Sequence, residues 1–162
     1  MKRELFLPDA DATGALGAAL ARVLPARALV FLEGDLGAGK TTLVRGLLRA
    51  LGHAGPVKSP TYTLLESYEA GGRRVHHFDL YRVAEPEELE FLGARECLGD
   101  EALVLVEWAR RAGDWLGSPD LSVALEMAGA GRRAVLESGS GALLDAVVRE
   151  FETLHEDPSL SH

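Results

Sequence analysis

The residues with the clearest chemical pattern are consecutive and read Gly34-Asp35-Leu36-Gly37-Ala38-Gly39-Lys40-Thr41-Thr42. They match the phosphate-binding pattern G-x-x-x-x-G-K-[ST]. Glycines in such a loop let backbone N–H groups approach phosphate oxygens, where a Cβ would block them. Lys40 would add a positive charge near the outer phosphates, and the Thr41 hydroxyl could bind Mg²⁺. The pattern therefore predicts a site for a nucleoside phosphate with Mg²⁺.

The segments on either side of this loop favour the same interpretation. The apolar run 29–32 before the loop is typical of a buried strand. After the loop, apolar residues recur on one helical face until Gly52, so a helix is expected to begin at about Gly39. Its free N-terminal amides would point at the same anion. The alternative is a glycine-rich turn before a helix with an exposed lysine.

Two acidic residues each follow an apolar strand elsewhere in the chain. Asp79 comes after 75–78, and Glu107 comes after 102–106. Ligands of open α/β sheets bind at the carboxyl ends of the strands, so Gly34, Asp79 and Glu107 are expected at one edge. Either acid could hold Mg²⁺ or orient the water that attacks a γ-phosphate. An ordinary solvated strand end is the alternative for each.

Composition narrows the class of protein. The chain has 162 residues, of which 47% are hydrophobic and 26% charged, which suits one globular domain. Its single cysteine, Cys97, is expected to be a small buried group, and a cytoplasmic location is expected. The net charge of −8 argues against binding nucleic acid by a broad basic surface. The chain has no Asn and no Gln, which excludes a guanine-reading Asn-Lys-x-Asp loop and a water-orienting Gln.

Hydrophobic periodicity and turn residues predict an α/β fold. Strands are expected at 3–7, 29–32, 63–68, 73–79, 102–107, 121–127 and 133–137, and helices over 16–24, 39–52, 85–92 and 140–154. We expect a single three-layer domain over residues 1–156, with a mixed, mostly parallel central sheet and helices on both faces. Residues 157–162 are expected to be a disordered tail.

Other residues carry weaker signals. Trp108 is expected in the core, with a role covering the site as the alternative. His76 and His77 are adjacent in a strand and so face opposite ways, which disfavours a metal site made from both. Arg132 is expected on a solvated face or paired with a phosphate.

Four motifs in order give the chain a family resemblance: 34–42, 57–62, 77–82 and 106–108. Over about residues 9–133 the chain resembles the bacterial TsaE (YjeE) family of P-loop NTPases, which act in tRNA threonylcarbamoyladenosine biosynthesis. The resemblance implies binding of ATP or ADP with Mg²⁺ and slow hydrolysis of ATP by the protein alone. It also implies action on the TsaB–TsaD complex, which modifies adenosine 37 of tRNAs reading codons that begin with A. Contact with tRNA would be indirect or through these partners.

The resemblance also implies roles for individual residues. Lys40, Asp79 and Glu107 would be catalytic, and Thr41, Glu107 and Asp79 would serve the metal. The nucleotide would be bound by the loop residues and by Thr13, Thr61, Asp79, Gly131 and Arg132. The family usually continues Glu-Trp-Pro after the second acid, whereas Ala109 follows Trp108 here.

Two other functions fit a phosphate-binding loop in a chain of this size. One is a small-molecule kinase, which would need a second substrate pocket and a lid over the phosphates. The other is a nucleotide-sensing module that changes its partner contacts without hydrolysis. The oligomeric state and the partner surface do not follow from the sequence.

Overall fold

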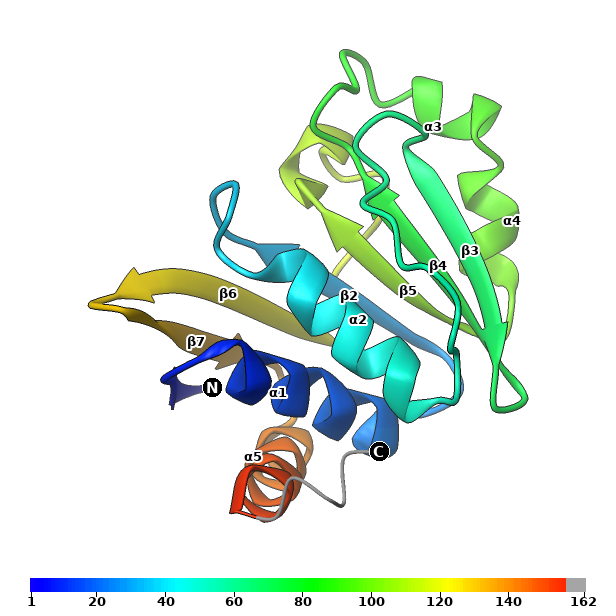
Figure 1. The fold of residues 1–162 in the computed structure, drawn as a ribbon. Coiled ribbons are helices and arrows are strands. Elements are labelled where there is room, and N and C mark those ends of the chain that lie inside the picture. Colours follow the sequence, from blue (N-terminus) through cyan, green and yellow to red (C-terminus); the bar gives the residue numbers. More distant parts are fainter. Residues whose placement is uncertain (157–162) are drawn as a thin grey trace.

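A seven-stranded mixed sheet forms the centre of the molecule in the computed structural model, which describes residues 1–156 (Figure 1). The strands are β1 (Lys2–Leu7), β2 (Ala28–Glu33), β3 (Leu65–Ala70), β4 (Arg73–Asp79), β5 (Ala102–Glu107), β6 (Leu121–Ala128) and β7 (Gly131–Glu137). Their order is β1-β7-β6-β2-β5-β4-β3. The four central strands β6, β2, β5 and β4 run parallel, and the strands at both edges pair antiparallel. The predicted mixed α/β sheet is confirmed.

Helices cover both faces of this sheet. Helices α1 (Ala10–Val23), α2 (Lys40–Ala50) and α5 (Gly141–Glu156) lie on one face. On the other face lie α3 (Glu88–Phe91), α4 (Ala94–Gly99) and the 3-10 turn η1 (Ala109–Ala112). Of the helices over residues 1–156, none combines the length and the apolarity that a bilayer span requires.

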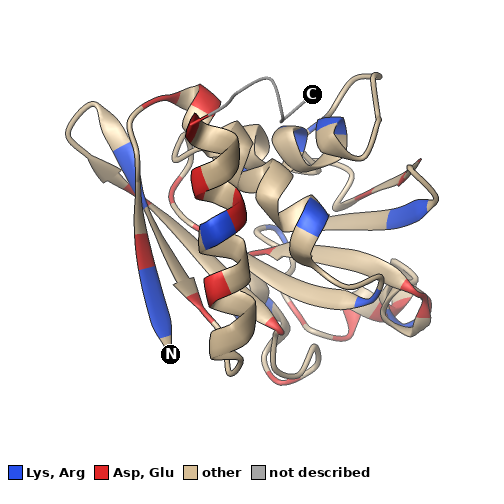
Figure 2. Cartoon of the chain, turned by 90° about the horizontal axis from the view of Figure 1, so that it is seen from below, with Lys and Arg blue, Asp and Glu red and all other residues tan. Residues whose placement is uncertain are grey.

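Helix α5 packs its apolar face on α1 and β1, and its outer surface carries charges of both signs (Figure 2). Two ion pairs at its margins, Arg3–Asp145 at 3.1 Å and Arg22–Glu150 at 3.2 Å, join it to β1 and α1. Ion pairs this accessible contribute about 0–1 kcal/mol each. Burial of apolar surface therefore holds α5 in place.

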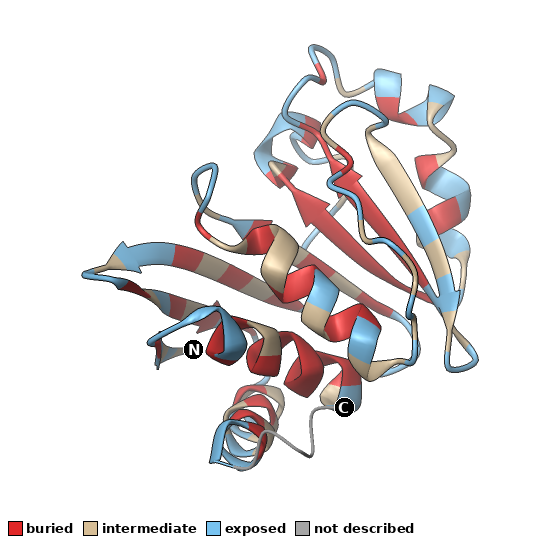
Figure 3. Ribbon diagram, in the orientation of Figure 1, coloured by how far each residue is buried: buried red, intermediate tan, exposed pale blue. Residues whose placement is uncertain are grey.

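The core divides at the sheet because successive side chains of a strand point to opposite faces. Burial accordingly alternates along the first residues of β6 (Figure 3). Every residue of β5 is buried. Leu103 and Leu105 pack beneath α1 and α2, whereas Val104 and Val106 pack against the elements of the opposite face. A strand covered on both faces explains the uninterrupted apolar run 102–106.

Two glycines allow α1 and α2 to approach closely. A Cβ on Gly17 would collide with the carbonyl oxygen of Leu43, and a Cβ on Gly46 would collide with that of Gly14. Each helix therefore contributes a glycine where the other backbone passes. This contact fixes α2, whose first residue is Lys40, against the rest of the molecule.

The boundaries of β3 differ from the sequence prediction of a strand at 63–68. The strand begins at Leu65, because residues 60–64 form a turn in which the Leu64 N–H donates to the Pro60 carbonyl at 2.8 Å. Leu64 has a φ of 67°, which is rare for a residue with a Cβ. Apolar alternation cannot reveal such a turn.

The predicted helix over 85–92 is also only partly correct. Residues 88–91 form the short α3, and a separate helix, α4, was not predicted. Gly93 lies between them with a φ of 72°, a conformation that interrupts a helix and suits glycine. The hairpin of β6 and β7 and the Ser140 cap are confirmed, the latter by the Leu143 N–H donating to Ser140 Oγ at 3.1 Å. The predicted disordered tail at 157–162 lies outside the described residues.

Candidate active site

The loop from Gly34 to Gly39 joins β2 to α2 and has the backbone that its glycines allow. Gly34, Gly37 and Gly39 have φ values of 145°, 83° and 110°, a region that residues with a Cβ rarely adopt. Gly39 precedes α2, and no side chain caps the first turn of this helix. Its amides are therefore available to an anion, as the sequence pattern predicted.

A cavity of about 470 Å³ opens beside this loop and contains most of the predicted site residues. It is lined by Leu36, Gly37, Gly39, Lys40, Thr41, Thr42, Ser59, Thr61, Asp79, Tyr81, Glu107 and Trp108. The segments that meet here are far apart in sequence: the loop and start of α2, the turn before β3, and the ends of β4 and β5. The structure therefore brings Lys40, Thr41, Thr61, Asp79 and Glu107 together.

The two acids end neighbouring parallel strands in the same register. Asp79 on β4 is the direct partner of Glu107 on β5, and the two are 6% and 4% exposed. Asp79 Oδ1 accepts from the Tyr81 N–H at 3.0 Å, and its Oδ2 accepts from Thr61 Oγ1 at 3.5 Å. Ser59 Oγ lies 2.8 Å from Thr61 Oγ1. The turn before β3 therefore contacts one of the two acids directly.

Glu107 lies between two nitrogen donors. Lys40 Nζ is 3.2 Å from Glu107 Oε1 and donates to the Gly34 carbonyl at 2.6 Å, while His77 Nε2 is 2.7 Å from Glu107 Oε2. Burial by itself raises the pKa of Glu107, but the hydrogen bond to His77 and attraction to His77 and Lys40 outweigh it. The net pKa of Glu107 is lowered, so its carboxylate is ionised at neutral pH.

Trp108 directly follows Glu107 and stands at the mouth of the cavity. It has a φ of 58°, and its ring centroid lies 4.9 Å from that of Tyr81 and 5.6 Å from Lys40 Nζ. The Arg110 guanidinium lies 5.0 Å from the same ring. The prediction of a core position is thus only partly correct: Trp108 is half-buried, packs against the core on one side and lines the cavity on the other.

Arg132 contacts the outside of the phosphate-binding loop. Its Nε donates to the Ala38 carbonyl at 3.1 Å and its Nη2 to the Gly37 carbonyl at 3.2 Å. Loop carbonyls that point outward leave the amide hydrogens free to point inward. The sequence left a solvated face or a phosphate partner open for Arg132. The structure shows contacts with the loop carbonyls, and pairing with a phosphate stays a prediction.

Thr13 and Gly131 lie behind the loop and do not line the cavity. Thr13 is buried, its hydroxyl is 3.4 Å from the Asp9 carbonyl, and its methyl group lies close to Gly39. Gly131 packs against the backbone of Leu7 at the β1–β7 pairing, where a Cβ would come within 2.6 Å of the Leu7 carbonyl oxygen. Contact of these two residues with a nucleotide stays a prediction.

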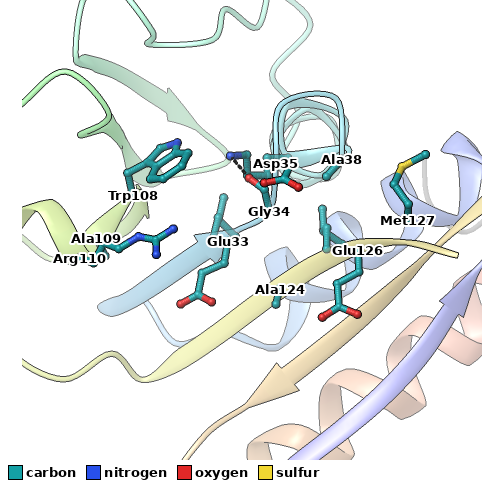
Figure 4. Close-up of a pocket in the computed structure, with 13 residues that line it drawn as sticks. Glu33, Gly34, Asp35, Ala38, Trp108, Ala109, Arg110, Ala124, Glu126 and Met127 are labelled. Atoms are coloured by element: carbon teal, nitrogen blue, oxygen red, sulfur yellow. Dashed lines mark hydrogen bonds between the residues drawn. The ribbon is translucent and has the colours of Figure 1, made fainter.

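A second cavity, of about 480 Å³, lies on the other side of Lys40 and Trp108, which line both cavities. Figure 4 shows Trp108 and Arg110 along one side, Glu126 and Met127 along the other, and Glu33 between them. Gly34, Asp35 and Ala38 of the phosphate-binding loop also line this second cavity and not the first. The sequence did not predict the cavity, because four of its thirteen lining residues, 124–127, come from β6, which has no chemical motif.

The donor atoms suit Mg²⁺ in combination with phosphate. Among residues 1–156, no group of three His, Cys, Asp or Glu side chains is arranged to hold a metal by itself. Mg²⁺ prefers one or two carboxylates, with water and phosphate oxygens completing its shell. Glu107, Asp79 and the Thr41 hydroxyl, all lining one cavity beside a phosphate-binding loop, provide that set.

Comparison with known proteins gives a consistent result. Residues 7–135 match the family described as Threonylcarbamoyl adenosine biosynthesis protein TsaE. The chain is 51% identical over 98 residues to the tRNA threonylcarbamoyladenosine biosynthesis protein TsaE of Haemophilus influenzae, covering 60% of this chain and 62% of that protein, which is less than two thirds of its length. It is 34% identical to the protein of that name from Rickettsia felis, over 87% of this chain and 84% of the relative. The crystal structure of Bacillus subtilis YdiB matches with a TM-score of 0.77 and 25% identity, over 97% of both chains.

Proposed function

The chain belongs to the TsaE family of tRNA threonylcarbamoyladenosine biosynthesis, and we propose that it serves there as a Mg²⁺-dependent ATPase acting on the TsaB–TsaD complex. The observation that carries this proposal is the single cavity that joins Lys40 and Thr41 to the paired acids Asp79 and Glu107. A phosphate-binding loop facing two carboxylates is the minimal arrangement for hydrolysis of a nucleoside triphosphate.

Binding of ATP would change the partners of Lys40. Its ammonium group pairs with Glu107 and with the Gly34 carbonyl of the loop. Triphosphate oxygens in the loop would offer Lys40 a stronger anion, so it would turn toward them. Glu107 Oε1 would then be available to the cation that accompanies the nucleotide, together with the Thr41 hydroxyl.

Mg²⁺, when bound, would neutralise charge on the outer phosphates. The attacking water would be directed by a carboxylate, since the chain contains no Gln. Its oxygen bonds to the γ-phosphorus as the bond to the β–γ bridging oxygen breaks, and ADP leaves with the electron pair. The water proton passes to the phosphate or to solvent.

Asp79 is the proposed link between the nucleotide and the turn before β3. Thr61 reaches Asp79 Oδ2, and Ser59 reaches Thr61. A change at the γ-phosphate that moves Asp79 or Thr61 would therefore move the segment 57–62, in which residues 58, 59 and 62 are exposed. Such a segment could report the nucleotide state to a partner protein.

Contact with tRNA is proposed to be indirect. A net charge of −8 opposes nucleic-acid binding over a broad surface. The biological activity would then depend on TsaB and TsaD, with slow hydrolysis by this protein alone.

The test combines ATP hydrolysis with tRNA modification. Purified protein should hydrolyse ATP weakly with Mg²⁺ and faster after addition of TsaB and TsaD, and multiple-turnover threonylcarbamoylation of tRNA should require it. Lys40→Ala and Glu107→Gln should abolish both effects while circular dichroism shows a folded chain. If tRNA modification proceeds equally without this protein, the proposal is wrong.

The same variants separate the two alternatives. A nucleotide-sensing module would support tRNA modification with Glu107→Gln, because it needs binding and not hydrolysis. A small-molecule kinase would phosphorylate a nucleoside or sugar rapidly without any protein partner.

A further inference from the structure

His77 is a buried histidine whose side chain makes one hydrogen bond within residues 1–156, and this bond is to the candidate active site. It lies on β4 and is 1% exposed. Its register partner on β5 is Leu105, so it reaches Glu107 diagonally, two residues further along the neighbouring strand. Its Nε2 lies 2.7 Å from Glu107 Oε2, and both side chains are almost fully enclosed.

The direction of this hydrogen bond follows from the chemistry of its partner. An ionised carboxylate can only accept, so His77 Nε2 must carry a proton and donate it. The other ring nitrogen, Nδ1, is buried and has no hydrogen-bond partner within residues 1–156. Nε2 is therefore the ring nitrogen that donates to Glu107. The only polar contact of the imidazole within residues 1–156 is therefore the hydrogen bond from Nε2 to Glu107.

The two oxygens of Glu107 have separate partners. Oε2 is held by His77 of the neighbouring strand β4, and Oε1 pairs with Lys40 at the cavity. If Lys40 turns toward phosphate, as in the proposed function, Oε1 loses its partner while Oε2 keeps one. The carboxylate would then retain its orientation with a free oxygen facing the cavity.

We infer that His77 is a positioning residue that fixes Glu107 Oε2 so that Oε1 is presented to the nucleotide-bound cation. This inference rests on the proposed function and goes beyond it by assigning a role to a residue that does not touch the ligand. Outer partners that orient metal ligands typically change metal affinity by about 10–100-fold when removed. A purely structural histidine would change stability and leave that affinity unaltered.

The neighbouring residue supplies a matched control. His76 is on the same strand and is also buried, but it faces the opposite side of the sheet. Its Nδ1 lies 2.8 Å from Ser67 Oγ and its Nε2 lies 3.2 Å from Asp100 Oδ2, so it has no contact with Glu107. The same substitution at 76 and 77 removes a buried imidazole in both cases and perturbs the site in only one.

The substitution itself can be chosen to test the donor. Glutamine carries its amide nitrogen at a distance from Cα similar to that of histidine Nε2, whereas asparagine is shorter and cannot reach as far. His77→Gln should therefore preserve the donation to Glu107, and His77→Asn should remove it. Both side chains are polar and smaller than or close to histidine in size, so overpacking is avoided.

The experiment is calorimetric titration with ADP, in excess Mg²⁺ and in EDTA, at one fixed pH. The readout is the factor by which Mg²⁺ tightens ADP binding. His77→Asn should lower this factor by about 10-fold relative to wild type, with binding in EDTA unchanged, while His77→Gln and the control His76→Asn keep it. Thermal melts of all variants measure the structural cost separately.

The outcomes distinguish failure of the proposed function from failure of the role assigned to His77. If wild type binds no ADP, or binds it equally with and without Mg²⁺, the proposed function fails and the role of His77 fails with it. If wild type shows the Mg²⁺ effect and His77→Asn shows the same factor, His77 does not position Glu107 and the proposed function stands. A loss in His76→Asn equal to that in His77→Asn would likewise reduce the effect to general destabilisation and overturn the assignment.

Discussion

Lys40 of the phosphate-binding loop and Glu107 at the end of β5 form an ion pair of 3.2 Å that is almost enclosed by protein. This contact joins the phosphate-binding loop to the end of β5, two segments that are far apart in the sequence and that both line the cavity. The pair keeps both charges satisfied at one point, and each charge is also a group that the proposed chemistry needs. The same contact therefore links stability to function.

Removal of one member of this pair should cost more stability than removal of both. Lys40→Met leaves the Glu107 carboxylate without its cation, and we expect the free energy of unfolding to fall by about 3 kcal/mol. The double variant Lys40→Met/Glu107→Gln should recover most of this loss, because no buried charge is left unpaired. Urea unfolding of wild type, both single variants and the double variant measures the coupling. If the two single losses in the free energy of unfolding simply added in the double variant, Lys40 and Glu107 would not be coupled and the prediction would be wrong.

Arg132 should hold the loop in its binding conformation through the carbonyls of Gly37 and Ala38. Hydrogen bonds from a charged donor contribute about 1.5–3 kcal/mol, so Arg132→Ala should weaken ADP binding by about tenfold. Without nucleotide, the amide hydrogens of residues 34–39 should exchange faster in this variant.

The adjacent Arg133 is the control for this prediction. It pairs at the surface with Glu126 at 2.6 Å and does not contact the loop. Arg133→Ala should leave ADP affinity and loop exchange unchanged. Weaker ADP binding without faster loop exchange in Arg132→Ala would point instead to a direct contact between Arg132 and the nucleotide.

The glycines between α1 and α2 should tolerate no side chain. Gly17→Ala and Gly46→Ala each place a methyl group against backbone of the other helix, and we expect a loss of about 1–3 kcal/mol in the free energy of unfolding. Gly14→Ala is the matched control on α1, because no atom lies within 4 Å of its added Cβ and alanine favours a helix. Thermal melts should rank Gly14→Ala at or above wild type and the other two below it.

Acid should weaken the hydrogen-bonded cluster of Asp100, His76 and Arg74, which involves the part of β4 away from Asp79. Hydrogen bonds from His76 and then Arg74 lower the pKa of Asp100. Because the pKa is lower in the folded chain than in the unfolded chain, ionised Asp100 stabilises the fold above the ordinary aspartate pKa of about 3.9. This contribution is lost as the pH falls through the lowered pKa. The difference in thermal unfolding midpoint between wild type and Asp100→Asn should therefore narrow between neutral pH and pH 3. A difference that stays constant with pH would contradict a stabilising role of ionised Asp100.

The sequence could predict the parts of the site that depend on local pattern. The loop 34–42 is fixed by its glycines, lysine and threonine, and the apolar runs before Asp79 and Glu107 identify buried strands. Because parallel strands end at one edge, the meeting of these segments also follows. The family resemblance added Thr61, whose hydroxyl lies against Asp79.

The contacts that depend on strand order and helix packing could not be predicted. The bond between His77 and Glu107 spans 30 positions and requires β4 beside β5, and the contact from Arg132 to the loop spans 94 positions. The glycine contacts of α1 with α2 require the crossing of two helices whose faces are individually ordinary. In each case the determining neighbour is distant in sequence, so the residue type alone has no distinguishing signal.

The most direct measurement is a crystal structure of the protein with ADP and Mg²⁺. We expect the phosphates to lie against the amides of residues 34–42, and the metal to lie about 2.1 Å from Thr41 Oγ1, with Glu107 or Asp79 reaching it directly or through water. Lys40 should have left Glu107 for the phosphates, and His77 should still hold Glu107 Oε2. Phosphates that do not contact the amides of residues 34–42, or a metal with no link to either acid, would contradict the account.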